Sequence, residues 1–117
     1  MLVQPESPRA VVYMCGARNE RPARLEAVEA GAVQWGKDQG YEVIDVLEDD
    51  LVNWQAKHRE ELGSALELLA NGEADVLIVP AEVYSQLRPA DQKWLKASCE
   101  EYGGRVETMP SDDGAWL

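Results

Sequence analysis

Four short runs of apolar residues, each closed by glycine, proline or acidic residues, recur along the chain. Runs of this length that are rich in β-branched residues are typical of buried strands. The sequence therefore predicts strands over residues 9–15, 41–47, 74–79 and 105–109. The second run leads into the acidic cluster Glu48-Asp49-Asp50, and the third, which is the most hydrophobic, ends at Pro80.

Between these runs, apolar residues recur at three- and four-residue steps, as expected for amphipathic helices. Helices are predicted from Pro22 to Gly40, over residues 58–69 and over residues 90–102, whereas Tyr84 and Ser85 are predicted in a loop. The side chains expected to face inward are Leu25, Val28, Ala32 and Trp35 in the first helix, Leu62, Ala65, Leu66 and Leu69 in the second, and Trp94, Leu95, Ser98 and Tyr102 in the third.

The resulting order, β-α-β-α-β-α-β, connects each strand to the next through a helical crossover, which favours parallel pairing. We therefore expect an α/β fold: a three-layer, doubly wound and mainly parallel sheet of four strands with about three helices. Ligands of such sheets bind outside the carboxyl ends of the strands. Any site is thus expected near Cys15, Glu48 and Pro80.

A chain of 117 residues is long enough for one hydrophobic core. We expect an extended lead-in over residues 1–8, one α/β domain over residues 9–109 and a flexible acidic tail over residues 110–117. No apolar run approaches the roughly 20 residues of a membrane span, and the start lacks the layout of a signal peptide. With only two widely spaced cysteines, the sequence predicts a cytoplasmic protein without disulfides.

The net charge of −11, from 22 acidic and 11 basic residues, argues against binding to nucleic acid. Proteins that bind a duplex neutralise its phosphates with Lys and Arg, and an acidic surface is repelled. The basic residues are scattered, and their one local concentration is the segment with Arg18, Arg21 and Arg24. We expect no direct contact with nucleic acid, although this segment could attract a smaller anion.

Several phrases, in this order and spacing, resemble the catalytic domain of the serine recombinases, the resolvases and invertases. The resemblance covers roughly residues 9–109 and implies a resolvase-like fold. The phrases that carry it are Val12-Tyr13, Gly40-Tyr41-Glu42-Val43 leading to Glu48-Asp49-Asp50, Arg59 with Leu62, Gly72 through Val79, and Tyr102-Gly103-Gly104-Arg105-Val106.

The resemblance also implies a chemistry whose residues are missing here. The family attacks DNA with a serine after the first strand, and that position falls on Ala17 or, with a slip of one residue, on Gly16 or Arg18, none of which has a hydroxyl. The family's Asp-Arg-Leu-Ser-Arg phrase, which supplies arginines after the third strand, corresponds to residues 82–87, a run without arginine. Only Arg59 and the acidic Asp49 and Asp50 match. We therefore expect a catalytically inactive recombinase homologue.

Cys15 and His58 raise two other chemistries, a thiol phosphatase and a histidine base. Cys15 and Arg21 have the CxxxxxR spacing of a thiol phosphatase, but Glu20 places a negative charge in that loop, and small residues that would let amides converge on phosphate are lacking. This favours a buried thiol at a strand end. His58 has no visible partner and is expected at a solvated helix start.

A magnesium site at the acidic cluster would resemble that of receiver domains. Those domains also need a phosphoacceptor after the third strand, where Val79 and Pro80 stand. No metal and no cofactor are predicted.

The sequence thus favours a non-catalytic resolvase-like domain that acts through a protein partner or self-association, with Trp54 and Trp116 as interface residues. A variant of this hypothesis is an acidic mimic of DNA. The alternative is a small protein or enzyme that binds an anionic ligand at the strand-end loops, through Cys15, Arg18, Arg21, Asp49 and Arg59.

Overall fold

The computed structural model describes residues 7–16, 22–50 and 59–110. Its elements, in chain order, are β1 (Arg9–Gly16), α1 (Pro22–Asp38), β2 (Glu42–Asp50), α2 (Glu60–Ala70), β3 (Val76–Pro80), α3 (Ala81–Ser85), α4 (Pro89–Glu101) and β4 (Arg105–Met109). Ala17, Arg18, Arg21, Trp54, His58 and Trp116 lie outside the described residues, as does the predicted tail from residue 111 onward.

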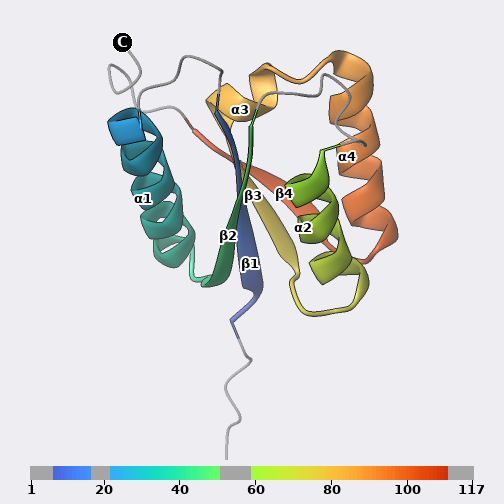
Figure 1. Cartoon of the computed structure of the whole chain (residues 1–117). Helices are drawn as coiled ribbons and strands as arrows, with labels where there is room; N and C mark the ends of the chain where they lie inside the picture. The colour runs from blue at the N-terminus through green and yellow to red at the C-terminus, as the bar shows by residue number, and fades with distance from the viewer. Residues whose placement is uncertain (1–6, 17–21, 51–58, 111–117) are drawn as a thin grey trace, which may run out of the picture.

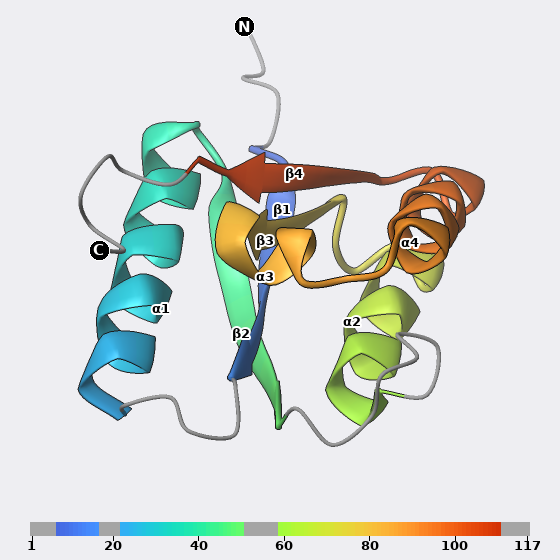
Figure 2. The ribbon, with the colours of Figure 1, turned by 90° about the horizontal axis from the view of Figure 1, so that it is seen from above.

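The four strands form one parallel sheet in the order β2-β1-β3-β4. Helix α1 covers one face of the sheet, and α2 and α4 cover the other (Figures 1 and 2). The predicted three-layer, doubly wound α/β architecture is therefore confirmed. Among the described elements, α3 is a helix that the sequence pattern did not predict, because five residues are too few to display a helical period.

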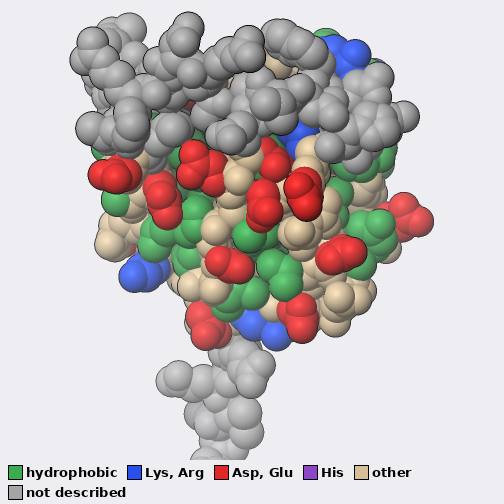
Figure 3. All heavy atoms as spheres, in the orientation of Figure 1, with side chains coloured by type: hydrophobic (Ala, Val, Ile, Leu, Met, Phe, Trp, Pro, Cys, Tyr) green, Lys and Arg blue, Asp and Glu red, His purple; other side chains and the backbone are tan. Residues whose placement is uncertain are grey.

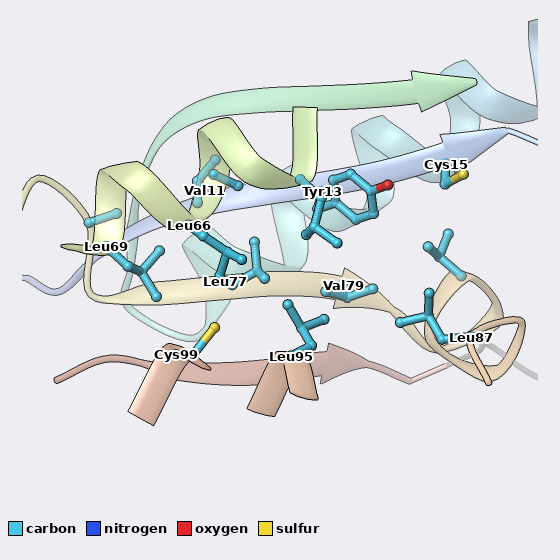
Figure 4. Close-up of a cluster of buried hydrophobic side chains, with 14 residues drawn as sticks. Val11, Tyr13, Cys15, Leu66, Leu69, Leu77, Val79, Leu87, Leu95 and Cys99 are labelled. Atoms are coloured by element: carbon cyan, nitrogen blue, oxygen red, sulfur yellow. The ribbon is translucent and has the colours of Figure 1, made fainter. Parts of the chain in front are cut away.

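The hydrophobic core is divided by the sheet because successive strand side chains point to opposite faces. Val11, Tyr13 and Cys15 of β1 face α2 and α4 (Figure 4), whereas Ala10, Val12 and Met14 face α1. The predicted inward residues of α2 are all buried: Leu62, Ala65, Leu66 and Leu69.

The inward face predicted for the last helix is partly wrong. In α4 the buried residues are Asp91, Leu95 and Cys99, which follow one another at four-residue steps. Tyr102, expected inside, is 45% exposed. It follows the last helical residue and precedes Gly103, whose φ of +80° turns the chain away from the helix.

The second strand is longer than predicted, since β2 continues through the acidic cluster to Asp50. Its register with β1 shifts once, because Ala10 pairs with Val43 but Val11 pairs with Asp45. Ile44 is therefore the extra residue of a β-bulge. Beyond the bulge the ladder is regular up to the pair Gly16 and Asp50.

The strands β1 and β3 are paired only over Ala10–Val12 and Val76–Ile78. Beyond that point β1 continues along β2, while β3 continues along β4 as far as the pair Pro80 and Met109. The chain leaves β1 toward one edge of the sheet and β3 toward the other, so their carboxyl ends form the topological switch point. This end of the sheet is where the candidate site lies.

Candidate functional site

Three polar side chains are buried together at the carboxyl end of β1 and β2: Tyr13, Asp49 and Arg59. Their exposed fractions are 0%, 8% and 5%, respectively. Burying a polar or charged group is costly unless it is hydrogen-bonded or paired. The way in which these three groups satisfy one another therefore decides what the site can do.

The carboxylate of Asp49 accepts three hydrogen bonds. Its Oδ1 accepts from the backbone N–H of Glu61 at 2.9 Å, and its Oδ2 accepts from the backbone N–H of Leu62 at 3.0 Å and from the hydroxyl of Tyr13 at 2.9 Å. The two amides belong to the first turn of α2, where backbone donors have no partner inside the helix. Asp49 thus caps α2 from a neighbouring strand, and its charge is favourable at the helix N-terminus.

The register of the sheet places Asp49 in this position. Tyr13 pairs with Leu47 and Cys15 pairs with Asp49, so these side chains share the face of the sheet that is covered by α2. Helix α2 has no side-chain cap of its own, since the residue at that position is Arg59. The acidic residue on β2 supplies what the local sequence lacks.

Arg59 immediately precedes α2 in an extended conformation and is buried beside Tyr13. Burial raises the pKa of the Tyr13 hydroxyl far above its ordinary value, and the nearby Arg59 side chain acts in the opposite direction. The hydroxyl therefore stays protonated at neutral pH and can donate to Asp49.

Both cysteines of the chain are buried, and neither forms a disulfide. Cys15 lies on β1 next to Asp49 on β2, whereas Cys99 lies in α4 against the core. Burial, with a smaller effect of Glu100, raises the pKa of Cys99 to about 12. Cys99 is therefore suited to packing and not to nucleophilic chemistry.

We expect Cys99 to react with iodoacetamide in the native protein more slowly than free cysteine by about a thousandfold or more, because the thiolate is the reacting species. Mass spectrometry of tryptic peptides after timed alkylation at pH 8 would measure the rate, with the urea-unfolded protein as the control. Rapid labelling of Cys99 in the folded state would contradict its burial.

The segment that follows β3 carries no arginine until Arg88. Val83 is buried in the core, and the hydroxyl of Ser85 donates to the carbonyl oxygen of Glu82 at 2.9 Å. Arg88 donates from Nε to Oδ2 of Asp91 at 2.8 Å, across the start of α4. This part of the switch point is therefore built from packing and local hydrogen bonds.

Of the site residues proposed from sequence, the structure brings together Cys15, Asp49 and Arg59. It does not describe Arg18 and Arg21. Sequence reasoning did not identify Tyr13 as a site residue, although a tyrosine within an apolar strand signals a buried hydroxyl that needs a partner. In the described part of the chain, no three His, Cys, Asp or Glu side chains are grouped so as to hold a metal ion. None of the described helices combines the length and apolar character needed to cross a bilayer.

Solved structures share this arrangement of strands and helices. The C-terminal catalytic domain of ISC1926 TnpA, an IS607-like serine recombinase, is similar with a TM-score of 0.74 and 20% identity, over 91% of this chain and 72% of that one. The C-terminal catalytic domain of IS1535 TnpA, also an IS607-like serine recombinase, has a TM-score of 0.60 and 19% identity, over 88% of this chain and 72% of that one. No protein-family model matches the sequence, and no curated protein gives a significant match. The chain thus has a serine recombinase-like fold, as its sequence predicted.

Proposed function

We propose that this protein is a non-catalytic member of the serine recombinase-like fold that acts through contacts with other proteins. The proposal rests on one observation: the polar residues Asp49 and Arg59, which match the family, are buried, and Asp49 is held by hydrogen bonds within the domain. Asp49 is occupied by two amides of α2 and by Tyr13, and Arg59 is 95% buried. These residues serve the stability of the domain.

The burial of Arg59 argues against a role in holding a phosphodiester. An arginine that stabilises a developing phosphorane must reach the reacting group, and its guanidinium must be free to turn toward it. Exposing Arg59 would separate it from Tyr13 and from the start of α2. Val83, which stands in the segment where the family has arginines, is part of the core.

Charge supports the same proposal. The net charge of −11, with basic residues scattered along the sequence, opposes approach to DNA. An acidic surface is in contrast well suited to attract a basic protein partner.

The alternative function, binding of a small anion near Cys15, is less well supported. Asp49, one of the residues assigned to that site from sequence, is an acidic group beside Cys15. A carboxylate there would repel an anionic ligand.

We expect no covalent protein–DNA adduct and no strand cleavage when the purified protein is incubated with supercoiled plasmid and magnesium. We expect the same of Ala17→Ser, which restores a hydroxyl near the nucleophile position without the missing arginines. Denaturing gel electrophoresis of labelled DNA measures both products, and a purified active serine recombinase with its own site is the positive control.

Strand cleavage by the wild-type protein that Arg59→Lys reduces would contradict the proposal. The second part of the proposal, that the protein acts through contacts with other proteins, needs a separate experiment. Size-exclusion chromatography with light scattering and crosslinking in a cell extract should reveal a dimer or a complex. Replacing Trp54 or Trp116 with alanine is expected to weaken it. A strictly monomeric protein that crosslinks to nothing would count against an interaction role.

A further inference from the structure

The strand β2 forms an edge of the sheet, since the order β2-β1-β3-β4 gives it one neighbour. Figure 1 looks onto this edge, with α1 and α2 on either side of it. Edge strands expose backbone groups and are frequent sites of contact with other chains. The side chains along β2 therefore indicate what this edge can bind.

Over residues 42–49 of β2, four side chains are exposed: Glu42, Ile44, Asp45 and Glu48. Ile44 is the bulge residue and is 39% exposed, which makes it one of two large hydrophobic residues exposed in the described chain. Figure 3 shows acidic side chains spread around apolar ones on this face. The β2 edge, defined by these four residues, thus exposes Ile44 between acidic side chains, with Asp45 on the α2 side of the sheet and Glu48 on the α1 side.

Pairing with the same edge of a second copy is disfavoured. A two-fold axis would bring Glu42, Asp45 and Glu48 against the same residues of the partner, and like charges facing each other are destabilising. The backbone N–H of Val46 is moreover bonded to Oδ1 of its neighbour Asp45 at 2.8 Å. The bulge and this local bond both hinder the addition of a further strand.

The geometry points to the β2 edge as the docking surface for a basic segment of a partner protein, bound by side-chain contacts. Lys or Arg side chains of that segment would pair with Glu42, Asp45 and Glu48, and an apolar side chain between them would cover Ile44. The choice of occupant follows from charge complementarity. This inference rests on the proposed protein-binding function and specifies the chemistry of the partner.

A short synthetic peptide that alternates lysine and valine is the probe, and a peptide that alternates glutamate and valine is its control. Each peptide is titrated into ¹⁵N-labelled protein. The basic peptide should shift the backbone amide resonances of residues 42–48, and the acidic peptide should not. Shifts concentrated elsewhere, or equal shifts with both peptides, would overturn the inference.

Two double variants distinguish binding at the β2 edge from an effect of the protein's overall charge. Glu42→Lys with Glu48→Lys changes the net charge as much as Glu67→Lys with Glu101→Lys, and all four residues are exposed. The first pair should weaken peptide binding by about tenfold, because it replaces attraction with repulsion at the contact. The second pair should change binding by less than about threefold at physiological salt, because charges beyond about 8 Å are screened.

Equal weakening by both pairs would show a general polyanion effect and would refute the β2 edge as the site. The outcome is distinguishable from failure of the proposed function. If the wild-type protein forms crosslinked complexes with other proteins, and the Glu42 and Glu48 variant forms them equally well, this inference falls and the interaction role stands. DNA cleavage by the wild-type protein would instead remove the proposed function.

Discussion

Replacing Asp49 with asparagine is expected to lower the free energy of unfolding by about 3 kcal/mol. This value is typical of removing a buried charge that is fully hydrogen-bonded. Asparagine keeps one acceptor oxygen, but its NH₂ group would face one of the donors that now surround the carboxylate: the amides of Glu61 and Leu62 and the hydroxyl of Tyr13. The charge at the N-terminus of α2 is lost as well. Urea denaturation followed by circular dichroism measures the change.

Tyr13→Phe is the matched control for this effect. It removes one of the three donors to Asp49 and leaves the carboxylate and both amide contacts in place, so about 1 kcal/mol of destabilisation is expected. In the Asp49→Asn protein, amide hydrogen exchange should accelerate at Glu61 and Leu62 more than at the end of α2. A loss of stability no greater than that of Tyr13→Phe would show that Asp49 does not hold the site together.

Gly104→Ala should destabilise the protein by about 2 kcal/mol, within the range for overpacking a close contact. A Cβ atom at this position would lie 2.7 Å from Cδ2 of Leu69 and 2.8 Å from the backbone oxygen of Asp75. That oxygen accepts the hydrogen bond from the N–H of Arg105 at 3.1 Å, at the point where β4 begins beside β3. Because a backbone atom cannot rotate away, the start of β4 would have to move.

Gly63→Ala, in the middle of α2, is the control for this substitution. Apart from the adjacent residues and the backbone of α2 itself, no atom lies within 4 Å of the Cβ that would be added, so the change should stabilise the helix by up to about 1 kcal/mol through the greater helix propensity of alanine. Thermal unfolding of both variants and the wild type gives the comparison. A neutral effect at Gly104 would contradict the close approach of the chain to Asp75.

The strands and the long helices of this fold could be predicted because their patterns are local. The β-branched run that precedes Pro80 and the four-residue spacing from Leu62 to Leu69 are visible in a short window of sequence. The alternation of strands and helices then implied parallel pairing. The short helix α3 was not predicted, because it has too few residues to show a period. The inward face of α4 was predicted correctly at Leu95 but not at Asp91 and Cys99.

The candidate site was predictable only in part. The sequence indicated Cys15, Asp49 and Arg59, but it grouped Asp49 with Glu48 and Asp50 as an acidic loop. The structure instead continues β2 through that cluster and turns Asp49 inward. Alternation along a strand assigns Glu48 and Asp49 to opposite faces, so one is exposed and the other buried.

The sequence by itself determined the class of the fold and the net negative charge, and it predicts that the family's nucleophile position falls on Ala17. Only the tertiary structure decided that Asp49 is a structural cap and that Arg59 is buried. The reason is physical: the donors to Asp49 lie 12, 13 and 36 positions away along the chain. They meet only when the sheet register and the docking of α2 are both in place.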